Sequence, residues 1–340
     1  MSATGEVRMP TPDLFFQTAR AYQGSAAIKS AVELNVFTTI GEGATEAAEI
    51  AKRVGASERG IRILCDYLVI LGFLTKSGSR YALTPDSATF LDRRSPMCVA
   101  SAANFLCDKR MAGTFDYLTE SIRRGRSAVP EGESTQPENP MWIQFAESMA
   151  PMMAGVANIV AGAIEPLIAQ SKKALDIATG HGMFGITVAQ RNPQIEVSAV
   201  DWPQVLEVAK RNAQKQGVAD RFHPIPGSAF EVNFGGGYDL ILLPNFLHHF
   251  SREVIEGFLK KVHAALVPSG ATVIVEFVPN EDRVTPEPAA GFALTMLSST
   301  LEGDAYTYRE YESMLRNAGF SKVTSQAIPP APQTLIIAAK

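Results

Sequence analysis

From residue 173 to the end of the chain, short β-prone runs alternate with longer stretches of helical character. A chain that alternates in this way builds a mostly parallel sheet with helices on both faces, so this pattern constrains the fold more than any other feature. It predicts strands over residues 174–178, 196–201, 222–226, 238–244 and 271–277, and a closing pair over 322–328 and 334–339. We therefore expect a doubly wound, Rossmann-like α/β domain that binds its ligands beyond the carboxyl ends of the strands.

The chain before residue 170 lacks this alternation and is mostly helical in character. Apolar residues at helical spacing predict helices over 25–34, 45–52 and 58–71, with Thr45 and Ser57 as N-caps. Two β-prone runs over 72–84 flank a Ser-Gly-Ser turn, and helices followed by a hairpin form the winged-helix pattern. Longer helical stretches are predicted over 104–122 and 141–167, separated by an exposed polar loop. We expect a winged-helix domain over 1–100, a helical region over 101–170 and an α/β domain over 171–340.

Composition narrows the possible partners. Hydrophobic residues make up 46% of the 340 and charged residues 19%, so apolar surface is left to bury against another subunit or a ligand. Residues 1–90 contain nine basic and nine acidic side chains, which argues against nucleic-acid binding by the winged helix. The three cysteines have no C-x-x-C spacing, and the longest apolar stretch, 154–164, is too short to span a bilayer. We expect a cytoplasmic protein without a disulfide framework, a metal site or a membrane segment.

A glycine-rich loop follows the first predicted strand of the α/β region. Gly180, Gly182 and Gly185 form G-x-G-x-x-G, and Asp201 lies 21 positions after Gly180 at the end of the next strand. Such glycines let the backbone approach a cofactor closely, and an acid at this position accepts hydrogen bonds from ribose hydroxyls. The motif alone fits NAD as well as S-adenosylmethionine, and a glycine-rich turn without a ligand is a further alternative. Asp176, four residues before Gly180, completes D-x-x-x-G-x-G, which is typical of S-adenosylmethionine-dependent methyltransferases.

Further segments continue the same layout: LDIATGHG, AVDWP, PGSAF, LPNFLHHF, ATVIVE and GDAYTYREY. With these the chain resembles, over nearly its whole length, the class I S-adenosylmethionine-dependent O-methyltransferases of the caffeic acid and acetylserotonin type, including bacterial members of secondary metabolism. The resemblance implies a homodimer formed through the N-terminal domain. It also implies S-adenosylmethionine as cofactor, S-adenosylhomocysteine as product and no metal.

The resemblance also implies roles for single residues. Asp176, Gly180 and Gly182 would hold the methionine end of the cofactor, Asp201 its ribose and Trp202 its adenine. The segment matching the family's Gly-Asp-Phe-Phe would lie near the adenine amine; it consists of Gly227, Ser228, Ala229 and Phe230. Ser228 replaces the usual Asp, and Ala178 stands where many members have glycine. Asn245 occupies a position from which some members contact the cofactor through an arginine.

The predicted catalytic base is His248, which matches the histidine of the family's His-Asp-Trp segment. A phenol with a pKa of about 10 needs a base at neutral pH, and imidazole, with a pKa of about 6.5, is suited to that task. The strands ending at Pro244 and Glu276 finish on the same edge of the sheet, so Glu276 is expected to orient His248. A second acid present in plant members is replaced by Ala305, which leaves Glu302, Asp304 or neither as a substitute. A purely structural role for His248 is the alternative.

Two segments rich in methionine and aromatic residues are expected to line an acceptor pocket, although such stripes also occur in ordinary cores. The predicted lining residues are Phe145, Met149, Met153, Phe292 and Met296. The predicted reaction is methyl transfer to a hydroxyl of a small aromatic or polyketide-like acceptor. A C- or N-methyltransferase, a non-methylating member of the fold, a winged-helix regulator that senses S-adenosylmethionine and a dehydrogenase remain as alternatives.

Overall fold

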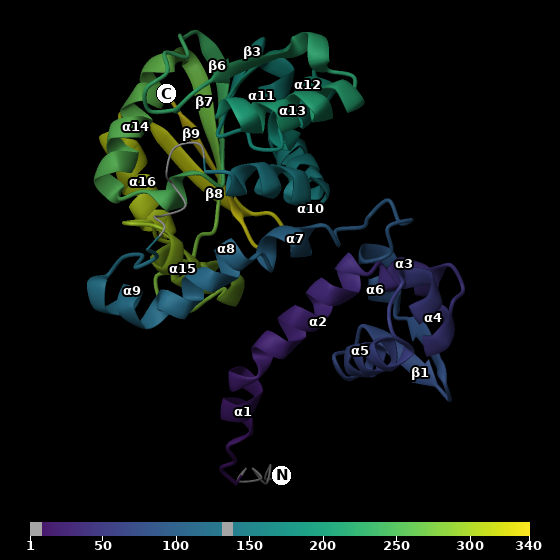
Figure 1. The fold of residues 1–340 in the computed structure, drawn as a ribbon. Coiled ribbons are helices and arrows are strands. Elements are labelled where there is room, and N and C mark those ends of the chain that lie inside the picture. The colour runs from purple at the N-terminus through teal and green to yellow at the C-terminus, as the bar shows by residue number, and fades with distance from the viewer. Residues whose placement is uncertain (1–8, 131–138) are drawn as a thin grey trace, which may run out of the picture. The chain divides into compact units, whose positions relative to one another are not determined.

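The computed structural model describes residues 9–130 and 139–340. The chain divides into two compact units, Met1–Cys107 and Asp108–Lys340, each with its own hydrophobic core (Figure 1). The division of the chain at residues 100 and 170 that the sequence suggests stays a prediction.

Unit 1 consists of short helices and one two-stranded hairpin. Its elements are α1 (Asp13–Ala19), α2 (Ala21–Glu33), α3 (Val36–Gly41), α4 (Ala47–Val54), α5 (Glu58–Ile70), β1 (Leu74–Ser77), β2 (Arg80–Leu83), α6 (Pro85–Phe90) and α7 (Ala102–Leu106). Ser57 caps α5 as predicted, since its Oγ accepts the Gly60 N–H at 3.1 Å. The prediction for Thr45 is wrong. The N-cap of α4 is Glu46, and Thr45 accepts the Tyr81 N–H through its carbonyl, next to a bridge between Glu46 and β2.

An apolar arm extends from unit 1. Helices α1 and α2 run away from the helices α3–α6 (Figure 1), and no residue of α1 is buried. The exposed fractions are 75% for Leu14, 69% for Phe15 and 51% for Phe16. Contiguous apolar surface of this kind marks a site of association.

Unit 2 begins with helices that precede its sheet. They are α8 (Lys109–Ala112), the 3₁₀ turn η1 (Gly113–Tyr117), α9 (Leu118–Arg124), α10 (Met141–Ala163) and α11 (Glu165–Gln170). The single helix predicted over 104–122 is wrong because α7 ends at Leu106 and Asp108 starts a new helix, its carboxylate accepting the Arg110 N–H at 2.9 Å. The stretch predicted over 141–167 is divided at Ile164, and Pro166 lies in the first turn of α11.

The sheet of unit 2 has seven strands and confirms the predicted fold class. In spatial order they are β5 (Phe222–Pro226), β4 (Glu196–Asp201), β3 (Lys173–Ile177), β6 (Tyr238–Pro244), β7 (Leu266–Glu276), β9 (Thr334–Ala339) and β8 (Lys322–Ala327). The first five run parallel, and β9 is antiparallel to both of its neighbours. Parallel strands bring their carboxyl ends to one edge, where the loops after β3, β4, β5, β6 and β7 meet.

Helices cover both faces of the sheet. In Figure 1, α11, α12 (Met183–Arg191) and α13 (Pro203–Lys215) lie on one side, and α14 (Arg252–Ala265) and α16 (Tyr308–Asn317) lie on the other. Between β7 and α16 the chain forms α15 (Glu287–Ser299), and short 3₁₀ turns are η2 (Ala219–Arg221) and η3 (Leu247–His249). No helix among the described residues is long and apolar enough to cross a membrane.

Candidate functional site

The loop after β3 turns sharply at the edge of the sheet. Gly180 and Gly182 have φ angles of 55° and 81°, a left-handed conformation that glycine adopts without strain. Ala178 has a φ of 53°, so alanine stands here in a strained backbone conformation. A Cβ on Gly180 would lie 3.6 Å from Phe145 of α10, so this helix covers the loop closely.

Asp176 lies beneath this loop and is fully buried. Its Oδ2 accepts the Thr179 hydroxyl at 2.7 Å and the Gly185 N–H at 2.9 Å, while Oδ1 has no hydrogen-bond partner. Burial raises the pKa of this carboxyl to about 7. A buried acceptor without a donor is costly, and a cationic group placed there would satisfy it.

Asp201 ends β4 beside the same loop. Its Oδ2 accepts the Gly180 N–H at 2.8 Å and its Oδ1 the Trp202 N–H at 2.7 Å. Burial raises the pKa of Asp201 to about 6. Each carboxylate oxygen can accept more than one hydrogen bond, so Asp201 shapes the loop and retains capacity for hydroxyl donors. Trp202 packs against the buried cluster of Ala146, Val205 and Val208, as do Trp142 and Ile143 at the start of α10.

The segment after β5 is anchored by Lys261 of α14. Gly227 has a φ of 130°, and its N–H donates to the Asp201 carbonyl at 2.9 Å. The Lys261 ammonium donates to the carbonyls of Ala229, Phe230 and Val232 at 2.7–3.0 Å. The Ser228 hydroxyl accepts the Phe230 N–H at 3.3 Å. The Phe230 ring is 38% exposed and packs against Phe246, Phe250 and Phe258.

His248 and Glu276 form the most tightly paired titratable groups at this edge. His248 Nδ1 lies 2.5 Å from Glu276 Oε2, and the side chains are 4% and 0% exposed. Glu276 Oε1 accepts the N–H groups of Phe246 and Leu247 at 2.9 and 2.8 Å, which fixes η3 and the histidine that it carries. With Nδ1 directed at the carboxylate, Nε2 is the nitrogen left to accept a proton.

His249 has different surroundings. Its Nδ1 is buried without a partner, and burial holds its pKa well below the usual value. Its ring packs edge-on against Trp142 at 5.3 Å. Among the described residues, no group of three or more His, Cys, Asp or Glu is arranged to hold a metal ion.

The predicted acceptor residues come from α10 and α15. Phe292 packs edge-on against the His248 ring at 4.8 Å and stacks on Phe277 at 4.1 Å. Met149, Met153 and Met296 are buried. Met153 Sδ lies 3.9 Å from the Asn245 amide nitrogen, so α10 reaches both the loop after β3 and the residue that follows β6. The structure thus brings Phe292 to the candidate base and Phe145 and Met153 to the predicted cofactor residues.

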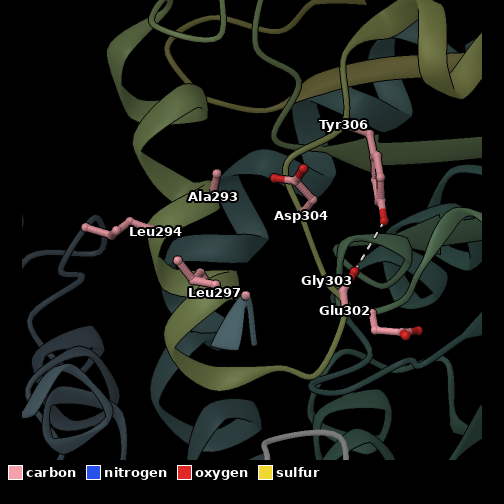
Figure 2. A pocket seen from close by; sticks show the side chains of 8 residues that line it. Ala293, Leu294, Leu297, Glu302, Gly303, Asp304 and Tyr306 are labelled. Carbon is pink, nitrogen blue, oxygen red and sulfur yellow. Dashed lines mark hydrogen bonds between the residues drawn. The ribbon is translucent and has the colours of Figure 1, made fainter. Parts of the chain in front are cut away.

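A cleft of about 450 Å³ lies next to this region (Figure 2). One wall is α15, with Ala293, Leu294 and Leu297, and the other is the segment 302–306. None of the five predicted acceptor residues lines it. Asp304 accepts from Arg283 and from the Ala305 N–H, and Ala305 is completely buried. The Glu302 side chain points away from α15 in Figure 2.

Two polar residues at this edge were not anticipated from the sequence. His181 is stacked between Phe145 and Phe184, its Nδ1 accepts the Met183 N–H, and burial lowers its pKa to about 4. Gln333, in the turn before β9, lies 3.5 Å from Asn245 Oδ1, and its own Oε1 is buried without a partner. The position of His181 inside the glycine motif was a usable signal. Gln333 gave none, because only the pairing of β9 with β7 brings it there.

Comparison with known proteins agrees with this architecture. Residues 116–321 match the model of an O-methyltransferase domain, and residues 16–93 match that of an O-methyltransferase dimerisation domain. The chain is 28% identical to the tetracenomycin polyketide synthesis 8-O-methyltransferase TcmO of Streptomyces glaucescens over 335 residues, 97% of each chain.

Solved structures show the same fold. One is a crystal structure of a protein from Nostoc punctiforme PCC 73102, provisionally assigned as an O-methyltransferase. It superposes with a TM-score of 0.94 at 50% identity and covers 98% of this chain and 100% of that one. Human N-acetylserotonin methyltransferase, solved in complex with S-adenosylmethionine, gives a TM-score of 0.85 at 22% identity and covers 99% of each chain.

Proposed function

This chain belongs to the O-methyltransferase family, and from that premise we propose that it methylates a hydroxyl of an aromatic or polyketide-like acceptor, with His248 as general base. S-adenosylmethionine is the methyl donor. The observation that carries the proposal is the 2.5 Å contact between His248 Nδ1 and Glu276 Oε2 at the carboxyl edge of the sheet. The name of the relative TcmO, a methyltransferase of polyketide synthesis, supports the acceptor class.

The residues at the edge fit the cofactor. The free Oδ1 of Asp176 and the fixed turn at Gly180 and Gly182 suit an ammonium-bearing methionine moiety, and Asp201 has capacity left for ribose hydroxyls. We assign the adenine end to Trp202 and to the segment from Gly227 through Ser228 and Ala229 to Phe230. Asn245 is assigned to the cofactor from the end of β6. When bound, S-adenosylmethionine supplies a methyl group activated by a sulfonium.

The chain's own contribution is to place and deprotonate the acceptor hydroxyl. His248 Nε2 takes the phenolic proton, because a phenol with a pKa of about 10 is mostly protonated at neutral pH. Glu276 holds the other nitrogen and stabilises the imidazolium that forms. Asp304 is occupied by Arg283 and the Ala305 N–H, and Ala305 has no acid to offer. We therefore propose that His248 acts with Glu276 alone.

The acceptor binds against neutral apolar side chains. Phe292 packs against the His248 ring, and we assign Phe145, Met149, Met153 and Met296 on α10 and α15 to the same acceptor site. Because these five residues bring no charge, a flat, neutral ring system with one hydroxyl directed at His248 is preferred over a sugar or a peptide. Unit 1, which matches the dimerisation-domain model and has an apolar arm, forms a homodimer with a second copy.

The test is a panel of phenolic acceptors with methyl-labelled S-adenosylmethionine, with wild-type protein and His248→Ala. We expect wild-type turnover and a loss in kcat of about 10²–10⁴ for the variant, with S-adenosylhomocysteine binding kept. His223→Ala is the matched control, because His223 also pairs with a glutamate, at 2.6 Å, but lies exposed on β5. An unchanged rate in His248→Ala would refute the assignment of the base.

Product analysis separates the alternatives. The chemical shift of the transferred methyl carbon distinguishes a methoxy group from methyl on carbon or nitrogen. A non-methylating member would bind S-adenosylhomocysteine and turn over no acceptor. A regulator would bind a DNA duplex, and a dehydrogenase would bind NAD instead.

A further inference from the structure

The segment 302–306 packs against the main chain at His248, the proposed base. The Asp304 N–H donates to the His248 carbonyl at 3.0 Å, and the Tyr306 hydroxyl donates to the Phe250 carbonyl at 2.7 Å. A Cβ on Gly303 would collide with the His248 carbonyl oxygen. The position of the His248 backbone therefore depends on where this segment lies.

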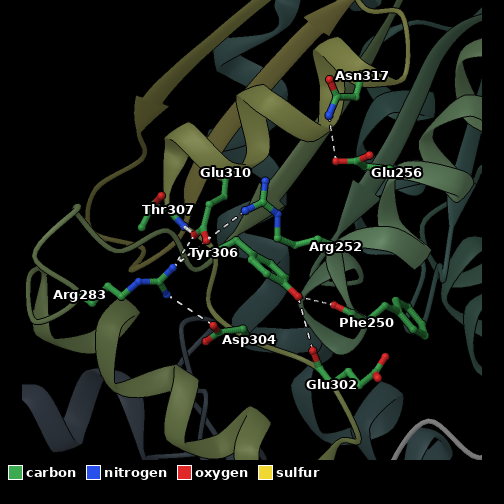
Figure 3. A network of polar contacts seen from close by, with 10 residues as sticks. All are labelled: Phe250, Arg252, Glu256, Arg283, Glu302, Asp304, Tyr306, Thr307, Glu310 and Asn317. Atoms are coloured by element: carbon green, nitrogen blue, oxygen red, sulfur yellow. Dashed lines mark hydrogen bonds and ion pairs between the residues drawn. The ribbon is translucent and has the colours of Figure 1, made fainter.

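Arg283 ties this segment to helix α16 (Figure 3). Its guanidinium contacts both carboxylate oxygens of Glu310, at 2.7 and 2.8 Å, and Asp304 Oδ2 at 3.4 Å. Glu310 in turn accepts the Thr307 N–H at 2.8 Å, just beyond the segment. One side chain thus joins two acids on either side of residues 305 and 306.

One further contact links these residues to the start of α14, which follows η3. Arg252, the first residue of α14 and close behind η3, lies 3.8 Å from Glu310. Arg283 lies in the connection that follows β7, whose last residue is Glu276. Two residues close together in the chain therefore act on His248: Glu276 contacts its ring, and Arg283 holds the segment that contacts its backbone.

The backbone at Arg283 is held in an unusual conformation. Its φ is 57°, which is costly for a residue with a Cβ. Neighbouring hydrogen bonds hold this conformation. Asp282 accepts hydrogen bonds from the N–H groups of Val284 and Thr285, both at 2.9 Å, and the Arg283 N–H donates to the Asn280 carbonyl at 2.9 Å. Strained residues persist where the surroundings determine them, and they concentrate at functional sites.

We propose that Arg283 is a positioning residue for methyl transfer, which acts on His248 through Asp304 and the segment 302–306. The inference rests on the proposed function, because it assigns Arg283 to the same base. Its guanidinium touches neither the predicted cofactor residues nor the acceptor lining, so its contribution is to the geometry of proton removal.

The experiment compares Arg283→Ala, Arg283→Lys and Arg316→Ala in the full chain with an active phenolic acceptor. We expect Arg283→Ala to lower kcat by about 10–100-fold, the scale of a small misplacement of a catalytic group. The KM for S-adenosylmethionine should stay within about 3-fold of wild type, and Arg283→Lys should recover part of kcat. Arg316→Ala is the matched control, since Arg316 pairs with Glu312 on α16 at similar exposure but does not touch the segment.

A double-mutant cycle tests the route of the effect. Asp304→Ala should lower kcat comparably, and adding Arg283→Ala should lower it little further, because both changes break the same link. An unchanged kcat in Arg283→Ala, an equal loss in Arg316→Ala or strictly additive losses would each overturn the inference. His248→Ala is measured in parallel. If it keeps the wild-type rate, the proposed base and this inference fall together; if only Arg283→Ala keeps it, this inference alone falls.

Discussion

At the scale of single residues, Glu276 performs two tasks with its two oxygens. Oε1 accepts the N–H groups of Phe246 and Leu247, while Oε2 holds His248 Nδ1. A carboxylate at this position therefore shapes the turn and also selects the tautomer of the histidine. The two tasks are separable by substitution.

We predict that Glu276→Gln keeps the fold and lowers kcat by about 10²-fold or more. The amide oxygen can still accept the backbone N–H groups, but the amide NH₂ would donate to Nδ1 and leave the proton on Nε2, which then cannot act as a base. Glu276→Ala should instead lower the melting temperature strongly, because buried N–H groups lose their acceptor at about 1–3 kcal/mol each. Rates and thermal denaturation of both variants check this, and a Glu276→Gln enzyme with wild-type kcat would contradict it.

Asp176 gives a prediction about pH. Its pKa is raised from 3.8 to about 7 in the folded chain, so the folded state binds the proton more tightly than the unfolded state. The stability that Asp176 contributes to the ligand-free protein is therefore present at low pH and is lost as the pH rises from about 4 to about 7. Asp176→Asn should raise the free energy of unfolding at pH 8, on the order of 1–4 kcal/mol, and weaken S-adenosylhomocysteine binding.

Chemical denaturation at pH 5 and pH 8 measures the effect on stability. Asp220→Asn, at an exposed position in η2, serves as the control and should leave the difference between the two pH values unchanged. Equal stability of Asp176→Asn and wild type at pH 8 would show that the carboxyl is not a source of destabilisation.

At the scale of elements, segment 302–306 lies directly against turn η3. Gly303 is the contact point, because a Cβ there would collide with the His248 carbonyl oxygen and lie 2.6 Å from Thr300 Oγ1. Glycine is required here for close approach and not for a left-handed backbone.

We predict that Gly303→Ala lowers kcat by about 10-fold or more, because the segment must move and His248 with it. Gly257→Ala is the matched control: Gly257 lies in α14, an added Cβ meets nothing within 4 Å, and alanine should stabilise the helix by about 0.5–1 kcal/mol. Kinetics and thermal denaturation distinguish the two. A fully active Gly303→Ala enzyme would show that the segment tolerates displacement.

At the scale of the whole molecule, the surplus of apolar residues has two destinations. One is the acceptor lining that we propose on α10 and α15 of unit 2, and the other is the arm formed by α1 and α2. Leu14, Phe15 and Tyr22 are 75%, 69% and 69% exposed, which fits helices that a second subunit covers.

We predict that the wild-type protein sediments as a dimer and that Phe15→Asp shifts it towards a monomer. The reason is that a charge placed in an apolar interface must be desolvated without a partner. Val254→Asp, at an exposed position on α14 of unit 2, should leave the dimer intact. Sedimentation velocity over a range of concentrations measures both, and a wild-type monomer would contradict the assignment of the arm.

The sequence by itself determined the α/β class, the strands and the residues that follow them. Period and composition are local properties, so the glycine motif, Asp201 and the pairing of His248 with Glu276 could be placed on one edge of the sheet. Local reasoning failed at Asp108, whose side chain caps a new helix, and at Thr45, whose backbone carbonyl accepts a hydrogen bond from β2.

Only the tertiary structure decided which distant residues surround that edge. Arg283, Asp304 and Glu310 are separated along the chain and converge because the connection after β7 folds back on α16. Gln333 reaches Asn245 only because β9 pairs antiparallel to β7. Such contacts depend on the path of the chain between elements, and no periodicity encodes that path.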